Sequence, residues 1–199
     1  WPNKVKTMQK NWIGKSFGCE VKFLISSSKD IEEIKCFTTR PDTLFGLSFL
    51  ALSVDHPLSK FYINDKKFLE FKQKCSETGT TEASIANAEK IGFKTDLTAI
   101  NPLDNSIKVP VYFANFVLMD YGLGAAHDQR DLDFAKKYKL NVKTVITPKK
   151  DDLNFKVTDE AYTGPGYIFN SSFLNGLQCP DTSIINTIEY LEKNNLGKK

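Results

Sequence analysis

The sequence is poor in the residues that build metal and disulfide sites. Its 199 residues include four cysteines, at positions 19, 36, 75 and 179, and two histidines. The cysteines lie far apart, so no CxxC pair is present for zinc or for a redox disulfide. Reduced thiols in a cytoplasmic compartment are the simplest interpretation. Two histidines exclude a histidine-rich metal centre, and we expect neither a metal nor another cofactor.

Long apolar runs are also missing. The longest largely apolar stretch, residues 44–52, has the length of a buried strand. It is far shorter than the roughly 18–20 residues that span a bilayer, so we expect no membrane segment. The N-terminus has neither an initiator methionine nor the apolar stretch of a signal peptide. We therefore expect a piece cut from a longer protein, and a monomer by default.

Charge of one sign is only slightly in excess. The formal net charge is +3, the sequence pI is about 8.5, and 41% of the residues are hydrophobic. This composition excludes an intrinsically disordered chain. The mild basicity permits a nucleic-acid partner without requiring one, because a strong phosphate-binding surface usually raises the pI above about 9.

Short strand patterns occur in runs with helical patterns between them. The alternation over residues 19–39 predicts a β-hairpin that ends at Arg40-Pro41-Asp42, because proline cannot donate to a ladder. Further strands are expected at residues 47–54, 93–100, 107–112, 116–120, 142–146 and 167–169. Helices are expected at residues 57–76, 82–90, 131–138 and from 181 or 182 to just before Gly197. This mixture predicts one α/β (α+β) domain, with an N-terminal segment (1–18) and a core built around strands (19–199).

Thr38-Thr39-Arg40-Pro41-Asp42-Thr43 is a dense polar cluster between two apolar strands. Threonine hydroxyls can donate to a carbonyl or ribose oxygen, and an arginine can grip a phosphate or carboxylate. From composition alone the cluster is equally a strand followed by a polar turn, with Asp42 capping backbone N–H groups. Both interpretations stay open on the residues alone.

A second cluster follows the expected glycine loop at residues 122–124. In His127-Asp128-Gln129-Arg130-Asp131, Asp131 begins the expected helix and Asp128 precedes it as caps often do. The two aspartates could hold a cationic amine or orient water, or they could form an N-cap and a solvated turn. No GxSxG elbow or Cys–His signature is present, so a nucleophilic triad is not expected. His56 is expected to be a capping or surface residue.

Together these two motifs resemble the threonine-rich region and the aspartate motif of leucyl-tRNA synthetase editing domains, in the bacterial and organellar form. The resemblance extends over essentially the whole chain. It includes residues 4–14 (KVKTMQKNWIG), 115–122 (NFVLMDYG), 164–166 (GPG), 170–171 (NS) and 173–177 (FLNGL). Editing domains of isoleucyl- and valyl-tRNA synthetases share the threonine-rich region but do not usually carry His-Asp-Gln-Arg-Asp.

The resemblance implies an editing-domain fold with a β-barrel-like core and peripheral helices, inserted into a larger synthetase. It implies hydrolysis of the ester of tRNA-Leu mischarged with isoleucine, norvaline or methionine, the second sieve of double-sieve editing. The implied partners are the tRNA-Leu 3′ end and the remaining synthetase chain, where ATP and leucine bind. The competing hypotheses are a non-catalytic module that binds the tRNA acceptor end with a decayed site, and a small-molecule domain unrelated to tRNA.

The resemblance also implies roles for single residues. Thr38 and Thr39 would contact the ester and terminal ribose, and Asp131 would hold the substrate ammonium. The methyl group of Thr43 would block leucine, and Arg40 would touch the backbone of the terminal nucleotide. Asp128 would support the site through hydrogen bonds. For His127 a structural role is favoured over assistance to the attacking water. Tyr121 and Gly124 are expected near the bound adenosine. No residue is a convincing general base, which favours a water placed by the threonines and the ribose hydroxyl.

One departure from the family concerns the loop before His127. The family usually has about five more residues, hydrophobic and ending in proline, between Ala125 and Ala126, and one of them normally lines the amino-acid pocket. Either this loop is truly shortened, which would cut back a pocket wall, or the sequence omits those residues. Continuous, normal backbone from residue 124 to 127 would exclude the omission.

Overall fold

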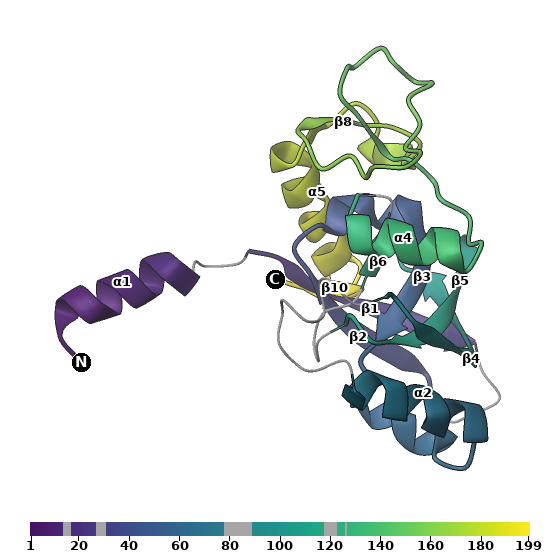
Figure 1. Ribbon diagram of the computed structural model, residues 1–199. Coiled ribbons are helices and arrows are strands. Elements are labelled where there is room, and N and C mark those ends of the chain that lie inside the picture. Colours follow the sequence, from purple (N-terminus) through teal and green to yellow (C-terminus); the bar gives the residue numbers. More distant parts are fainter. Residues whose placement is uncertain (14–16, 27–30, 78–88, 118–122, 126) are drawn as a thin grey trace.

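The computed structural model describes residues 1–13, 17–26, 31–77, 89–117, 123–125 and 127–199 (Figure 1). Its helices are α1 (Asn3–Ile13), α2 (Lys66–Glu77), α4 (Gln129–Lys137) and α5 (Asp181–Lys193), with 3-10 helices η1 (Pro41–Gly46), η2 (Pro57–Tyr62) and η3 (Ser172–Leu174). Its strands are β1 (Cys19–Ser26), β2 (Glu33–Thr38), β3 (Leu47–Leu52), β4 (Gly92–Asn101), β5 (Asp104–Ala114), β6 (Leu123–Ala125), β7 (Ile146–Thr147), β8 (Gly166–Ile168), β9 (Gln178–Cys179) and β10 (Gly197–Lys198).

Seven strands form one sheet in the order β10-β1-β4-β5-β3-β6, with β2 paired to β1. The β3–β5 pair is parallel and the other pairs are antiparallel. Strands β7, β8 and β9 form a smaller second sheet. The expected α+β class with peripheral helices is confirmed. In the described part of the chain the main sheet is an open path of strands, so its core is an open sheet instead of a closed barrel.

The predicted hairpin over residues 19–39 is confirmed. Its register pairs Cys19 with Thr38 and Leu24 with Glu33. The alternation buries Val21 and Phe23 and leaves Glu20 exposed. Pairing stops at Thr38, and η1 follows directly with a proline at its first position. This places the threonine cluster at the end of β2.

Strand β3 lies at the centre of the fold, and all six of its residues are buried. Leu50 and Leu52 point into the larger hydrophobic cluster, which includes residues of α2 and α5. Phe49 and Ala51 point into a smaller cluster that includes Phe134 of α4. The two clusters therefore lie on opposite faces, with α4 above the sheet and α2 below it in Figure 1. This explains why the strand sequence is apolar without alternation.

Two helical predictions need correction. The helix expected over residues 57–76 is two elements, η2 and α2. The side chain of Asp65 accepts hydrogen bonds from the backbone N–H groups of Lys67 (2.8 Å) and Phe68 (3.3 Å), so it starts α2 anew. The N-terminal segment expected only as a lead-in forms helix α1, which lies apart from the sheet (Figure 1). Of the helix expected at residues 82–90, only 89 and 90 are described, and they are not helical.

Three expected strands or loops also differ. Asn115 and Phe116 form a turn, so the strand predicted at residues 116–120 does not begin there, and 118–120 lie outside the described residues. In the expected glycine loop, Leu123 and Gly124 are part of β6, which pairs with β3. The strand predicted at residues 142–146 is regular only from Ile146. The helix predicted to begin near residue 181 is confirmed as α5.

Across the ranges that the structure covers, no helix combines the length and the apolar character needed to cross a membrane.

Candidate functional site

The backbone of Arg40 connects the first and last threonines of the cluster. Its N–H donates to the Thr38 Oγ1 at 3.0 Å. Its carbonyl oxygen accepts from the Thr43 hydroxyl at 2.9 Å and from the Thr43 N–H at 3.2 Å. The bond to Thr38 uses a lone pair, so the Thr38 hydroxyl proton is still available to an acceptor. The Thr43 hydroxyl is committed to Arg40, which fixes where the Thr43 methyl group points.

The three threonines differ in exposure. Thr39 is exposed, whereas Thr38 and Thr43 are 9% and 6% exposed. A hydroxyl at Thr39 therefore meets solvent and any bound ligand, while the other two threonines are held within the fold. The cluster offers one exposed hydroxyl next to two oriented ones.

The side chain of Arg40 turns toward the interior. Its Nε and Nη2 donate to the Asp42 carboxylate at 2.9 and 3.2 Å, and Nη2 also lies 3.0 Å from the Cys179 Sγ. The Ser183 hydroxyl of α5 donates to the Asp42 Oδ2 at 2.7 Å. Asp42 is fully buried. The turn interpretation, in which Asp42 caps backbone N–H groups, is therefore wrong: its oxygens bond side chains.

Arg40 was predicted as a site residue, but its internal bonds to Asp42 and Cys179 were not. Burial and the Asp42 charge raise the pKa of the Cys179 thiol to about 11, although the Arg40 charge acts against them. Despite burial, the bonds to Asp42 raise the pKa of Arg40 above its usual value. Both groups therefore stay protonated at neutral pH. The only sequence signal was an aspartate two residues after an arginine, in a polar cluster between two apolar strands.

Asp128 caps helix α4, as predicted. Its carboxylate accepts from the backbone N–H of Arg130 at 2.8 Å and of Asp131 at 3.4 Å. The Arg130 guanidinium also bonds it, at 3.1 and 3.3 Å. Burial works to raise the pKa of Asp128, but the bonds and charge of Arg130 outweigh it and the pKa is lowered. The helix begins at Gln129, two residues earlier than predicted.

Asp131 lies in the first turn of α4 and is half-buried. The partial positive charge of a helix N-terminus stabilises a carboxylate anion at this position. Because the Asp128 cap fixes the backbone N–H of Asp131, the cap also determines where the Asp131 side chain starts.

His127 is held through both ring nitrogens. Its Nδ1 lies 2.9 Å from the Tyr162 carbonyl oxygen, and its Nε2 accepts from the Val145 N–H at 3.2 Å. These partners require the neutral tautomer with the proton on Nδ1. Burial, with the Arg40 charge, lowers the pKa of His127, against the Tyr162 bond and the Asp42 charge. With no lone pair left to accept a proton from water, His127 has the favoured structural role.

Folding brings the two motifs to a common place. Strand β6 contacts η1, which carries Thr43, and also contacts α4, which carries Asp131. Within β6, Gly124 pairs with Phe49 of the neighbouring strand β3. Val145 provides a second connection between the aspartate motif and η1. Its N–H donates to His127, and its side chain lies against Gly46 at the end of η1. The approach is close, because a Cβ at Gly46 would come within 2.9 Å of the Lys143 carbonyl oxygen.

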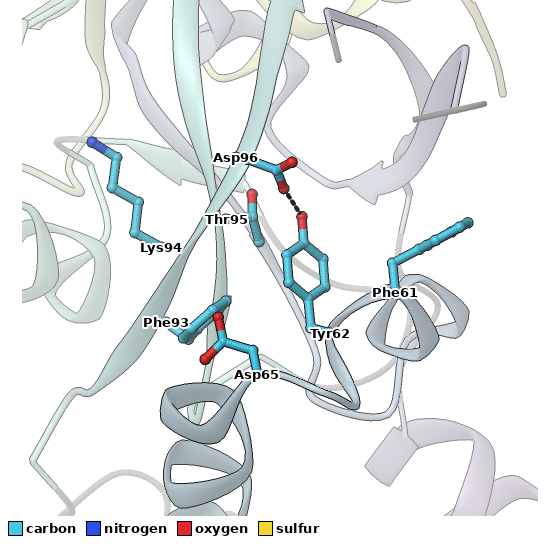
Figure 2. Close-up of a pocket in the computed structure, with 7 residues that line it drawn as sticks. All are labelled: Phe61, Tyr62, Asp65, Phe93, Lys94, Thr95 and Asp96. Carbon is cyan, nitrogen blue, oxygen red and sulfur yellow. Dashed lines mark hydrogen bonds between the residues drawn. The ribbon is translucent and has the colours of Figure 1, made fainter. Parts of the chain in front are cut away.

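A pocket of about 520 Å³ lies elsewhere, between η2, the start of α2 and β4. Figure 2 shows the Tyr62 hydroxyl pointing at the Asp96 carboxylate, to which it donates a hydrogen bond. Its lining residues are Phe61, Tyr62, Asp65, Phe93, Lys94, Thr95 and Asp96. None of them belongs to either motif, so this pocket gives no support to the predicted site.

Two expected features are not tested by the structure. Tyr121 and Ala126 lie outside the described residues, so neither the Tyr121 contact nor the two explanations for the short loop can be examined. In the ranges that are described, no three His, Cys, Asp or Glu side chains are grouped so that they could hold a metal ion.

Comparison with known proteins shows the family of this chain. The family described as "Leucyl-tRNA synthetase, editing domain" matches residues 10–191. The chain belongs to this family. The matched range includes the threonine cluster, β6 and the aspartate motif, and with them every predicted site residue.

The relatives are bacterial leucine–tRNA ligases. The editing domain is 48% identical to the ligase of Bartonella bacilliformis over 208 residues, covering 97% of this chain and 24% of the relative. It is 46% identical to the ligase of Brucella ovis, covering 98% and 23%. It is 52% identical to that of Rhodospirillum centenum, covering 89% and 21%. The chain thus spans less than a quarter of the length of these ligases.

A solved structure has the same fold. It is the crystal structure of the ternary complex of the Agrobacterium radiobacter K84 agnB2 LeuRS with tRNA and LeuAMS. The TM-score is 0.71 at 28% identity, covering all of this editing domain and 21% of that chain. The similarity therefore extends to the architecture of the whole domain.

Proposed function

We propose that this domain edits for a leucine–tRNA ligase by hydrolysing the ester of tRNA-Leu that carries isoleucine, norvaline or methionine. One observation carries the proposal: in a chain of this family, the threonine cluster and the aspartate motif meet at β6. The partners are the 3′ end of the tRNA and the remaining ligase chain, which binds ATP and leucine. The LeuRS–tRNA complex of similar fold supports tRNA as a partner.

The chemical need for such a site follows from the size of a methyl group. A synthetic site rejects a substrate that differs by one methylene only by about 1–3 kcal/mol. A second site that hydrolyses wrong products and excludes the correct one supplies the missing discrimination. Leucine and isoleucine differ only in the position of a branch, so the second site has to sense shape.

In the proposed reaction, water attacks the ester carbonyl carbon and the ribose oxygen leaves with a proton. The exposed Thr39 hydroxyl and the oriented Thr38 hydroxyl can place the water and stabilise the negative charge on the carbonyl oxygen. His127 is not available as the base, because its Nε2 already accepts the Val145 N–H. Placement of water by hydroxyls and by the substrate's own ribose is therefore the mechanism that the site supports.

Asp131 and Thr43 select the substrate in this proposal. Every aminoacyl ester presents an ammonium group, and the half-buried carboxylate of Asp131 would bind it whatever the side chain. Thr43 would instead sense the side chain. Its hydroxyl is bonded to the Arg40 carbonyl, so its methyl group has a fixed direction and can exclude leucine. Arg40 makes internal bonds, and its contact with the terminal nucleotide stays a prediction.

The arrangement of the chain supports an inserted domain. Glu20 and Val21 of β1 pair with Lys198 and Gly197 of β10. The segments before β1 and after β10 therefore leave the sheet at one place, as connections to a single larger body would. We place the ligase that carries this chain in the cytoplasm, with residues 1–199 as one editing domain whose core is residues 19–199.

Deacylation of isoleucyl-tRNA-Leu and leucyl-tRNA-Leu tests the proposal, both with this chain and with the complete ligase that carries it. We expect loss of the isoleucyl ester and survival of the leucyl ester. Asp131→Ala and Asp131→Asn should both slow hydrolysis by about 10- to 150-fold, because each loses a charge-assisted bond of about 1.5–3 kcal/mol. Asp133→Ala is the matched control, since Asp133 is exposed on the same helix.

Two outcomes would overturn this proposal. If the complete ligase binds tRNA-Leu but leaves both esters intact, the domain is the alternative, a binding module with a decayed site. If isoleucyl hydrolysis survives both Asp131 substitutions, Asp131 does not anchor the ammonium.

A further inference from the structure

The Asp42 carboxylate is unusual in its surroundings. It is fully buried, and in the described part of the chain it is the only aspartate or glutamate among the buried residues. A buried charge is costly unless it is paired and hydrogen-bonded. Asp42 meets this condition with two bonds from Arg40 and one from Ser183, which is 141 positions away on α5. The Cys179 thiol donates a longer bond to it, at 3.5 Å.

The other side of this arrangement is the backbone of Arg40. The same residue whose guanidinium is held by Asp42 contacts Thr38 through its N–H and Thr43 through its carbonyl oxygen. Without the Asp42 carboxylate, the Arg40 guanidinium would turn toward water. The Arg40 backbone would then lose the buried contact that holds it in place. The orientation of the Thr38 and Thr43 side chains therefore depends on Asp42, which acts on them only through Arg40.

We infer that Asp42, with Ser183, is a positioning residue for the amino-acid gate. The buried carboxylate ties Arg40 to α5, and the Arg40 backbone in turn fixes the Thr43 methyl group. Selectivity for isoleucine over leucine then depends on α5 as well as on the threonine cluster. The kinetic part of this inference rests on the proposed function.

Nuclear magnetic resonance of Thr43 tests the positioning directly and without any substrate. With threonine labelled at its methyl group, the Thr43 signal is assigned by its disappearance in Thr43→Ser. Three-bond couplings to the methyl carbon should show one rotamer in the wild-type domain. Asp42→Asn should give averaged couplings, and Ser183→Ala a smaller change in the same direction, because Arg40 keeps its two bonds to Asp42.

Thr187→Val is the matched control. Thr187 is buried on α5, and its hydroxyl donates to the Ser183 carbonyl at 2.7 Å, but it has no bond to Asp42. We expect this variant to lower the melting temperature and to leave the Thr43 couplings unchanged. Unchanged couplings in Asp42→Asn and Ser183→Ala would overturn the inference, as would an equal change in Thr187→Val.

Hydrolysis kinetics give the second readout. One methyl group discriminates by about 10- to 200-fold, so a loosened gate should lower the ratio of isoleucyl to leucyl hydrolysis about tenfold. In Asp42→Asn this includes a rise in leucyl hydrolysis, which loss of stability alone does not produce. A wild-type ligase that cleaves neither ester refutes the proposed function, whereas normal selectivity in Asp42→Asn refutes this inference alone.

Discussion

At the scale of single residues, His127 shows how a residue that looks chemical can be structural. The imidazole bridges the Tyr162 carbonyl and the Val145 N–H, two backbone groups that come from distant parts of the chain. His127→Ala leaves both partners unpaired and should lower the free energy of unfolding by about 2–6 kcal/mol, since each unpaired buried group costs about 1–3 kcal/mol.

The burial of His127 predicts a pH dependence of stability. Burial disfavours the charged ring and, despite the Tyr162 bond, holds the pKa of His127 in the folded state below its ordinary value of 6.5. Protonation would also place a hydrogen on Nε2, which now accepts the Val145 N–H. The unfolded chain then binds more protons below about pH 6.5, and stability falls as the pH drops through that region. Unfolding by urea at pH 7 and pH 5 measures this.

The control for this prediction uses the other histidine. His127→Gln should flatten the decline between pH 7 and pH 5. His56→Asn should retain the decline, because His56 caps η2 through Leu58 and asparagine is a good cap. An equal decline in wild type and His127→Gln would show that His127 is not its source.

Residue types at the site were readable from the sequence, but their partners were not. The threonines and aspartates stood out as polar clusters between apolar segments, and the family resemblance suggested their roles. Asp42 was interpreted as a turn residue because its partners, Ser183 and Cys179, lie 141 and 137 positions away. The packing of α5 on η1 brings Ser183 to Asp42, and Cys179 lies in β9 just before α5.

At the scale of helices and strands, the Asp128 cap connects stability to the site. Asp128→Ala should lower the free energy of unfolding by about 1 kcal/mol, because the first turn of α4 loses its side-chain acceptor. Asp128→Asn should stay within about 0.5 kcal/mol of wild type, since asparagine caps equally well and the exposed Arg130 pair contributes little. Thermal or urea unfolding of the three proteins decides this.

Asp128→Ala should also hydrolyse isoleucyl-tRNA-Leu more slowly than Asp128→Asn, because the cap holds the backbone of Asp131. An Asp128→Ala protein as stable and as active as Asp128→Asn would contradict the role of the cap.

Elements with local signals were predictable, and elements that depend on distant partners were not. The hairpin at 19–39, the buried strand β3 and the cap of α4 follow from alternation, apolar character and a single aspartate. The strand expected at residues 142–146 is short because its partner β8 has only three residues, and because the Val145 N–H bonds His127 in place of a strand. The break between η2 and α2 was readable from Asp65, which has the residue type of an N-cap.

At the scale of the whole molecule, the fold places two motifs almost ninety residues apart on either side of one short strand. Strand β6 contacts η1 and α4, and β3 beside it is buried on both faces. A rigid centre of this kind holds hydroxyls, carboxylate and methyl group at fixed positions, which selection by shape requires. Helix α1 lies apart from this centre (Figure 1).

The central claim is that the Thr43 methyl group protects leucyl-tRNA-Leu, and hydrolysis of that ester by two Thr43 variants tests it most directly. Thr43→Ser keeps the hydroxyl and loses the methyl group. Thr43→Val replaces the hydroxyl with a second methyl group, so a methyl group still occupies the blocking position without the bond to Arg40. We predict that Thr43→Ser cleaves leucyl-tRNA-Leu, by at least about tenfold over wild type, and that Thr43→Val continues to spare it. Intact leucyl-tRNA-Leu with Thr43→Ser, while the isoleucyl ester is cleaved, would contradict the account.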